Sequence, residues 1–110
     1  MENHVILCGY GRVGQEISNQ IKVQNIPIIV VESNEERADI AEDNDLDVLR
    51  GDATLDETLK IAGLEKCKSL VVTLPNDAAN LYVVLSAKGI RSSIRAVSYT
   101  HLTLPTILLV

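Results

Sequence analysis

The chain has 110 residues, 46% of them hydrophobic, and a formal net charge of −5. This length suffices for one domain with a buried core, and the acidic balance argues against a nucleic-acid partner, because phosphate contacts need a surplus of Lys and Arg. The core must be aliphatic, since the sequence has no Trp and no Phe. No secretory signal pattern and no apolar run of membrane-spanning length occurs, and Cys8 and Cys67 fit neither a disulfide framework nor a metal motif, so we expect reduced thiols in a cytosolic protein.

Short apolar runs alternate with amphipathic stretches along residues 1–96, with turn or capping signals between them. Capping boxes at 33–36 and 54–57 are each predicted to open a helix. Gly63 is predicted to end the helix that follows residue 54, and Gly89 to end the helix over 77–88. The predicted strands are 4–8, 26–31, 47–49, 69–74 and a fifth that begins at 93–96. The predicted helices are 13–23, 34–42, one that follows residue 54, and 77–88.

The spacing of apolar residues gives three of these helices a predicted inward face. The members of these faces are Val13, Ile17 and Ile21, then Leu55, Leu59 and Ala62, and finally Leu81, Val84 and Leu85. Strands that alternate with helices predict an α/β fold, a Rossmann-like open parallel sheet in the order 3-2-1-4-5 with helices on both faces. Such a sheet binds ligands at the carboxyl ends of its strands, beside the switch point between the first and fourth strands.

The last segment of the chain needs a separate interpretation. Residues 97–106 read VSYTHLTLPT and contain no Asp, Glu, Lys or Arg. They resemble the translation of a transposase adapter used in shotgun sequencing libraries, whose bases encode the same residues in one frame. The flanking adapter bases fit Ala96 and a stop codon after Val110. We therefore predict a natural domain over 1–96, which continued past Ala96 in the natural protein, and a non-native tail over 97–110.

The clearest motif is a G-x-G-x-x-G that follows the first predicted strand and opens the first predicted helix. Gly9 allows the tight turn, Gly11 lets the backbone approach a pyrophosphate, and Gly14 lets the helix pack close to the sheet. The free N–H groups and the dipole of the helix N-terminus favour phosphates. Arg12 and Val13 complete the motif, and Arg12 either reaches a phosphate or is a solvated surface arginine.

Glu32 ends the second predicted strand, about 20 residues after the glycine motif. A carboxylate at this place accepts hydrogen bonds from both ribose hydroxyls of an adenosine and repels a 2′-phosphate. The sequence therefore predicts NAD(H), ATP or ADP as the ligand and excludes NADP(H). The alternative is an exposed acid at a strand end.

Further polar residues follow the third and fourth predicted strands. Asp52 and Ala53 are candidates to border an adenine, although Asp52 also fits a helix cap. Thr73 lies beside the switch point and is a candidate to line the phosphate or ribose side. Asn76 and Asp77 fit a helix cap as well as a ligand contact.

The sequence offers no catalytic set. His4 starts a predicted strand and His101 lies in the adapter-like tail, so neither a Ser/His/Asp nor a Cys/His arrangement can be assembled. Cys8 is expected to be a small core residue. The acidic run 42–47 lacks the glycine and spacing of a calcium loop. We therefore predict a binding domain without a metal and without enzymatic activity.

Four blocks carry a family resemblance: HVILCGYGRVGQEI, VVESNEER, VLRGDAT and VVTLPNDAANLYVVLSAKG. Over residues 3–96 the chain resembles the N-terminal half of an RCK domain (regulator of potassium conductance), also called the Trk-type NAD-binding domain. The glycine motif is shared with many dehydrogenases, whereas the last two blocks are more specific. The resemblance implies a nucleotide-binding regulatory domain that gates potassium transport at the cytoplasmic face of the membrane.

The same resemblance implies contact residues for the nucleotide, partners of the domain and a fold that is incomplete in this chain. The implied partners are a potassium channel pore or a membrane uptake subunit, with a homo-oligomer of RCK domains in the full-length protein. The fold would be truncated before its last strand. Two alternatives stay open, the cofactor-binding half of an NAD-dependent dehydrogenase and the regulatory tail of a cation/proton antiporter. The implied contacts are Gly9, Gly11, Arg12 and Gly14 with phosphates, Glu32 with the ribose, Asp52 and Ala53 with the adenine, and Thr73 near the phosphates.

Overall fold

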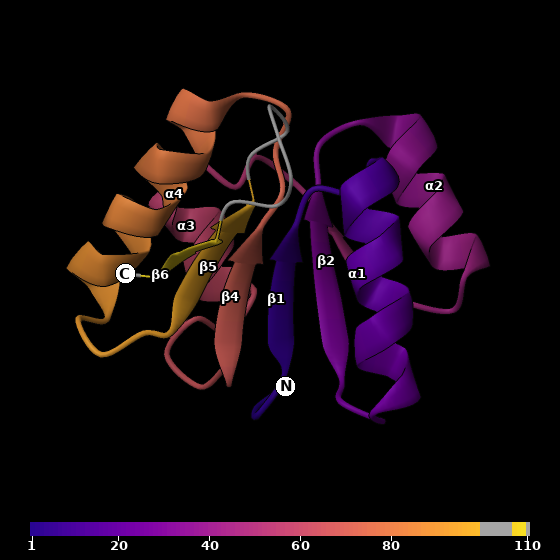
Figure 1. Ribbon diagram of the computed structural model, residues 1–110, viewed down its shortest axis with the longest axis horizontal. Helices are drawn as coiled ribbons and strands as arrows, with labels where there is room; N and C mark the ends of the chain where they lie inside the picture. The colour runs from indigo at the N-terminus through magenta and orange to yellow at the C-terminus, as the bar shows by residue number, and fades with distance from the viewer. Residues whose placement is uncertain (100–106, 110) are drawn as a thin grey trace.

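The computed structural model describes residues 1–99 and 107–109, which form one sheet between two layers of helices (Figure 1). The strands are β1 (Val5–Cys8), β2 (Ile28–Glu32), β3 (Asp47–Arg50), β4 (Ser69–Val72), β5 (Ala96–Tyr99) and β6 (Ile107–Leu109). The helices are α1 (Arg12–Val23), α2 (Glu35–Asp43), α3 (Asp56–Ile61) and α4 (Asp77–Ile90). Strands and helices alternate from β1 to β5, which confirms the predicted α/β class.

The sheet has the order β3-β2-β1-β4-β5-β6, so the predicted order 3-2-1-4-5 is confirmed. β1 to β5 pair in parallel, whereas β6 is an antiparallel edge strand that the sequence did not predict. β5 begins at Ala96 and not at residue 93, because a turn precedes it in which the Ile94 N–H donates to the Arg91 carbonyl. Part of the predicted tail thus completes β5 and forms β6. The rest of that tail, residues 100–106 with His101 and residue 110, lies outside the described residues.

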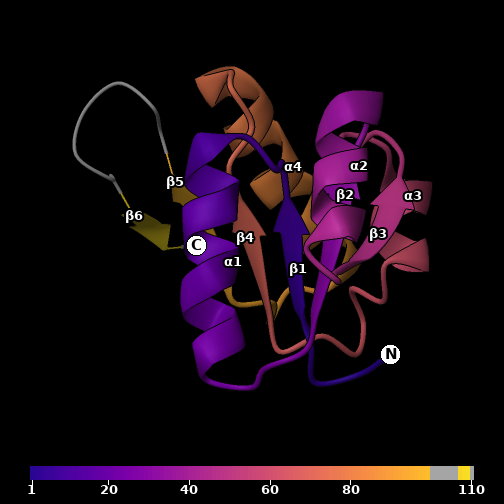
Figure 2. The same cartoon turned by 90° about the vertical axis from the view of Figure 1, so that its right-hand side faces the viewer.

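β1 shows how the sheet separates two apolar cores (Figure 2). Val5 and Leu7 belong to the core beneath α1 and α2, whereas Ile6 and Cys8 belong to the core beneath α3 and α4. All four side chains are buried. A strand covered on both faces reads as a continuous apolar run, which is why this segment was recognisable in the sequence.

Two helix starts differ from the predicted capping boxes. Asn34, not Ser33, caps α2, and its side chain accepts a hydrogen bond from the Arg37 N–H. α3 begins after Leu55 without a side-chain cap, because the Thr54 N–H and hydroxyl both donate to the carboxylate of Asp52. At α3, therefore, the short polar side chains of Asp52 and Thr54 satisfy each other and do not cap the helix that follows them.

The inward face predicted for α4 is wrong in two of its three residues. Leu81 and Leu85 are 45% and 57% exposed, whereas Val83 and Val84 are buried. α4 has apolar residues around most of its circumference, so helical spacing alone could not select the buried side. α4 also continues through Gly89 to Ile90 and does not end at that glycine.

Smaller differences affect the other predicted helix faces. Val13 and Leu55 are 39% and 54% exposed, because each lies in or before the first turn of its helix. The predicted end of α3 at Gly63 is confirmed by the positive φ of 90° at that residue, which favours glycine. No helix among the described residues combines the length and the apolarity needed to cross a membrane.

Candidate functional site

A cavity of about 360 Å³ lies at the carboxyl ends of β1, β2 and β4. These ends meet because Cys8 is in register with Val31 on one side and with Val72 on the other. The cavity therefore occupies the switch point predicted from the sequence. Its lining residues are Gly9, Tyr10, Gly11, Arg12, Val13, Glu32, Ser33, Asn34, Arg37, Thr73, Leu74, Pro75 and Tyr99.

The three glycines of the motif serve two different purposes. Gly9 has a φ of 97°, and a Cβ there would lie 2.8 Å from the Thr73 carbonyl oxygen. A Cβ on Gly14 would lie 2.3 Å from the Gly9 carbonyl oxygen, so the helix can approach the turn only without a side chain. A Cβ on Gly11 would meet nothing within 4 Å. The fold therefore requires Gly9 and Gly14, whereas Gly11 keeps space open in the cavity wall.

Thr73 fastens the glycine turn to the end of β4. Its hydroxyl lies 3.0 Å from the Cys8 carbonyl oxygen and 3.1 Å from the Gly9 carbonyl oxygen, and it donates toward both. Its backbone N–H donates to the same Cys8 carbonyl at 2.8 Å. Thr73 does line the cavity, as predicted from its position, but its hydroxyl proton is used within the protein.

Glu32 is 6% exposed and connects two loops of the site. One carboxylate oxygen accepts from the Tyr10 N–H at 2.7 Å, and the other accepts from the Asn34 N–H at 2.9 Å. A carboxylate has about four lone-pair positions, so each oxygen keeps one for a further donor such as a ribose hydroxyl. The carboxylate thus orders the glycine turn and the start of α2 while it faces the cavity.

Tyr10 is a structural part of the site that the sequence did not indicate. Its side chain is 1% exposed, and its hydroxyl accepts hydrogen bonds from Asn44 at 2.9 Å and from Ser18 at 3.4 Å. These partners belong to α1 and to the end of α2, so Tyr10 holds both helices beneath the turn. Its place between two motif glycines gave no signal of burial.

Arg12 and Val13 line the cavity from the first turn of α1, which contains no acidic residue. Asp52 and Ala53 are not brought into the cavity lining. The Asp52 carboxylate accepts the N–H of Thr54 at 2.9 Å and its hydroxyl at 2.7 Å, and these bonds lower the pKa of Asp52. Ala53 is 4% exposed and belongs to the core beneath α3.

Other lining residues were also not selected from the sequence. Leu74 and Pro75 directly follow Thr73, so their position after a strand end was an available signal. Arg37 lies in the first turn of α2, and Tyr99 ends β5, and for these two residues only the fold reveals the proximity to the glycine turn.

Two residues with potentially reactive side chains, His4 before β1 and Cys8 at the carboxyl end of β1, are buried. His4 is fully buried, and its Nε2 lies 2.7 Å from the Ala62 carbonyl oxygen. Burial, reinforced by the nearby Cys67 and Glu32, raises the pKa of Cys8 to about 12. Among residues 1–99 and 107–109, no three His, Cys, Asp or Glu side chains are grouped as metal ligands.

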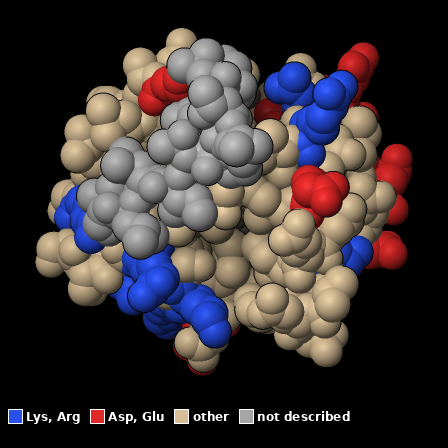
Figure 3. Space-filling model, viewed as in Figure 1, with Lys and Arg blue, Asp and Glu red and all other residues tan. Residues whose placement is uncertain are grey.

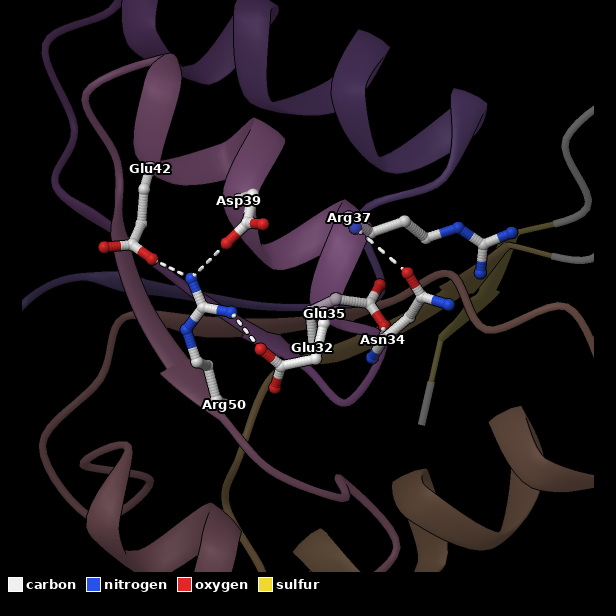
Figure 4. Close-up of polar contacts among 7 residues, drawn as sticks. All are labelled: Glu32, Asn34, Glu35, Arg37, Asp39, Glu42 and Arg50. Carbon is white, nitrogen blue, oxygen red and sulfur yellow. Dashed lines mark hydrogen bonds and ion pairs between the residues drawn. The ribbon is translucent and has the colours of Figure 1, made fainter.

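α2 is fixed to β3 by a cluster of charges (Figure 4). Arg50 of β3 pairs with Glu35 at 3.0 Å, with Asp39 at 2.7 Å and with Glu42. The Arg50 side chain is 34% exposed, so each contact is partly screened by water. The cluster lies outside the cavity. It engages three carboxylates of α2, whereas Arg37 of the same helix lines the cavity.

A parallel sheet of this order with a G-x-G-x-x-G turn at its switch point is the architecture of Rossmann-like nucleotide-binding domains. Within that class, the family model of the TrkA-N domain matches residues 5–103. The chain therefore belongs to the TrkA-N domain family, which confirms the resemblance found in the sequence.

Two relatives connect the family to ion transport. The chain is 40% identical over 100 residues to Potassium channel protein 1 of Methanocaldococcus jannaschii, a match that covers 89% of this chain and 30% of the relative. It is 31% identical over 99 residues to the putative cation/proton antiporter YbaL of Escherichia coli, covering 90% of this chain and 18% of the relative. The chain thus spans less than a third of either relative.

Two solved structures share the fold. The TrkA-N domain of the inner membrane protein ybaL from Escherichia coli superposes with a TM-score of 0.85 at 31% identity, covering 92% of this chain and 75% of that chain. GsuK bound to ADP superposes with a TM-score of 0.74 at 30% identity, covering 88% of this chain and 25% of that chain. The second structure shows that a relative of this fold binds an adenine nucleotide.

Proposed function

We propose that this chain is a nucleotide-binding regulatory domain that gates potassium transport on the cytoplasmic side of the membrane. The observation that carries the proposal is the cavity at the switch point, whose wall combines the glycine turn, the open position at Gly11 and the carboxylate of Glu32. The relationship to a potassium channel protein supports the coupling to potassium. The partner is then a channel pore or a membrane uptake subunit, and the domains act as a homo-oligomer in the complete protein.

The proposed ligand is NAD(H), ATP or ADP. Phosphates would lie at Gly9, Gly11, Arg12, Val13 and Gly14, where the N-terminus of α1 supplies N–H donors. The ribose would donate to the lone pairs of Glu32 that Tyr10 and Asn34 leave unused. A 2′-phosphate beside this buried carboxylate is repelled, so NADP(H) is excluded. The ADP-bound relative supports the choice of an adenine nucleotide.

A regulatory role fits the chemistry of the cavity better than catalysis. General acid–base catalysis needs a titratable group within reach of a substrate. The described lining offers Glu32 as its carboxylate, and both oxygens of that carboxylate already accept backbone N–H groups. A regulatory site needs only a ligand that binds two conformations with different affinities.

A second candidate is the regulatory domain of a cation/proton antiporter, which the similarity to YbaL favours. The site would bind the same nucleotide in that case, and only the transported ion would differ. The dehydrogenase alternative would require catalytic groups outside the described residues.

Two measurements test the proposal. Isothermal titration calorimetry of the chain should show binding of NAD(H), ATP or ADP and weaker binding of NADP(H). Potassium flux in liposomes that carry the complete transport system should respond to the same nucleotide, with a coupling free energy of about 1–3 kcal/mol. Gly11→Asp should abolish the response, because its carboxylate would occupy the proposed phosphate position. Flux that ignores nucleotide, or oxidation of NADH with a small substrate, would refute the regulatory function.

A further inference from the structure

α2 divides its charged residues between two sides. Glu35, Asp39 and Glu42 turn toward Arg50 of β3, whereas the side chain of Arg37 extends away from that cluster (Figure 4). β3 lies beyond β2 in the sheet and β1 lies on the other side of β2, so the side of α2 opposite β3 is the side of β1 and the glycine turn. Arg37 is thereby directed to the cavity, whose wall it forms together with Arg12.

The backbone at Arg37 is held firmly relative to the glycine turn. The Arg37 N–H donates to the Asn34 side chain at 3.0 Å, and the Asn34 N–H donates to Glu32 at 2.9 Å. Glu32 in turn accepts from the Tyr10 N–H at 2.7 Å. Three hydrogen bonds therefore link the first turn of α2 to the turn between β1 and α1, and the exposed guanidinium of Arg37 projects from a fixed base.

The cavity collects positive charge in an acidic protein. Every ion pair among the described residues involves Arg50. Within that part of the chain, neither Arg12 nor Arg37 therefore has a carboxylate oxygen within 4.0 Å of its guanidinium nitrogens. Glu32 is the acidic member of the described lining, and the first turn of α1 contains no acidic residue. Figure 3 shows Lys and Arg atoms gathered where α1 and α2 begin. Two guanidinium groups beside a helix N-terminus suit a ligand with several negative charges.

We propose that Arg37 is a second phosphate-binding residue of the nucleotide site and that, with Arg12, it makes affinity rise with the number of phosphates on the 5′ side of adenosine. The inference rests on the proposed function and specifies its ligand class, an adenosine di- or triphosphate in preference to the monophosphate. A phosphate chain laid over the N-terminus of α1 passes between the two guanidinium groups. Each added phosphate then gains a charge-assisted hydrogen bond.

The test is calorimetric titration of the chain with AMP, ADP and ATP at low ionic strength without divalent cations. The unaltered chain should bind ATP more tightly than ADP and ADP more tightly than AMP. Arg37→Gln should lower the affinity for ATP about tenfold and that for AMP by less than about threefold, as expected for one lost charged contact. The cap of α2 remains, because it uses the backbone N–H of residue 37. Arg37→Lys should restore part of the ATP affinity.

Arg95→Gln is the matched control, because Arg95 is exposed and lies outside the described cavity lining, so it removes the same charge elsewhere. It should leave all three affinities unchanged. Titration with NADP and NAD distinguishes a 2′-phosphate from the 5′ chain. A selective loss of NADP affinity in Arg37→Gln would place a 2′-phosphate at Arg37 and would overturn both the inference and the proposed exclusion of NADP(H). An equal loss for ATP and AMP, or no loss at all, would overturn the inference while the proposed function stands. An unaltered chain that binds no adenine nucleotide overturns both.

Discussion

One carboxylate oxygen of Glu32 accepts a hydrogen bond from the backbone N–H of Tyr10 at 2.7 Å, so the end of β2 holds the middle of the glycine turn. The second oxygen holds the loop before α2 through the Asn34 N–H. The sequence predicts a ribose acceptor at Glu32, with an exposed strand-end acid as the alternative, and gives no sign of this internal role. The two roles of this side chain can be measured separately. The internal hydrogen bonds affect the free energy of unfolding, and the proposed ribose contact affects the affinity for nucleotide.

Glu32→Ala should reduce both quantities. The N–H groups of Tyr10 and Asn34 lose their acceptor, which should lower the free energy of unfolding by about 1–3 kcal/mol in a denaturant titration. Loss of the charged ribose acceptor should weaken nucleotide binding by about 1.5–3 kcal/mol in calorimetry. Glu36→Ala is the control, because Glu36 is exposed on α2, and it should change neither quantity. Unaltered stability in Glu32→Ala would contradict the internal role.

Two glycines of the motif should differ in how much a substitution lowers the free energy of unfolding. Gly14→Ala places a Cβ 2.3 Å from the Gly9 carbonyl oxygen and should lower the free energy of unfolding by about 1–3 kcal/mol, since backbone must move to relieve the overlap. Gly11→Ala meets nothing within 4 Å and should change stability by less than about 0.5 kcal/mol. Thermal unfolding of the two variants side by side measures the contrast, and equal destabilisation would refute it.

Thr73 should stabilise the turn through its hydroxyl group. Thr73→Val keeps the shape of the side chain but removes the donor to the carbonyl groups of Cys8 and Gly9, so the free energy of unfolding should fall by about 0.5–1.5 kcal/mol. Thr73→Ser keeps the donor and should retain most of that stability. A denaturant titration of both variants makes the comparison, and a valine variant as stable as the serine variant would exclude the hydroxyl as an anchor.

The strands were predictable because their signal is strong and local. A strand such as β1, buried on both faces, leaves an unbroken apolar run, and the glycine turn follows it directly. The predicted strand order followed from the alternation of strands and helices with right-handed crossovers. The predicted positions of Gly9, Gly11, Arg12, Glu32 and Thr73 around one cavity followed from the same topology, because carboxyl ends of neighbouring strands meet.

The structure differs from the sequence predictions where one side chain has several possible partners. Thr54 and Asp52 satisfy each other, so Thr54 does not cap α3 and Asp52 does not enter the cavity. The buried side of α4 was ambiguous, since Leu81 and Val84 look alike to a helical period. The approach of Arg37 to the cavity depends on how Arg50 orients α2, which is a tertiary relationship without a local signature.

The buried thiol of Cys8 predicts a loss of stability at alkaline pH. Burial raises the pKa of this thiol from 9.0 to about 12. Between those values the unfolded chain releases the proton while the folded chain retains it, so the folded state binds more protons and the free energy of unfolding falls as pH rises. Well below pH 9 the thiol is protonated in both states, so the group contributes no pH dependence there.

Denaturant titrations from pH 8 upward should show this decline, and Cys8→Ala should make it shallower than in the unaltered chain. The alanine variant also loses packing in the core, so the comparison concerns the slope against pH and not the absolute stability. Cys67→Ala is the matched control: burial also raises the pKa of Cys67, but the guanidinium of Arg91 beside it acts in the opposite direction, so this variant should remove a smaller part of the slope. Iodoacetamide supplies an independent measurement, because only a thiolate reacts. At pH 8 the folded chain should leave Cys8 unmodified, whereas the urea-unfolded chain should be alkylated there, and alkylation of Cys8 at equal rates in both states would contradict the burial of its thiol.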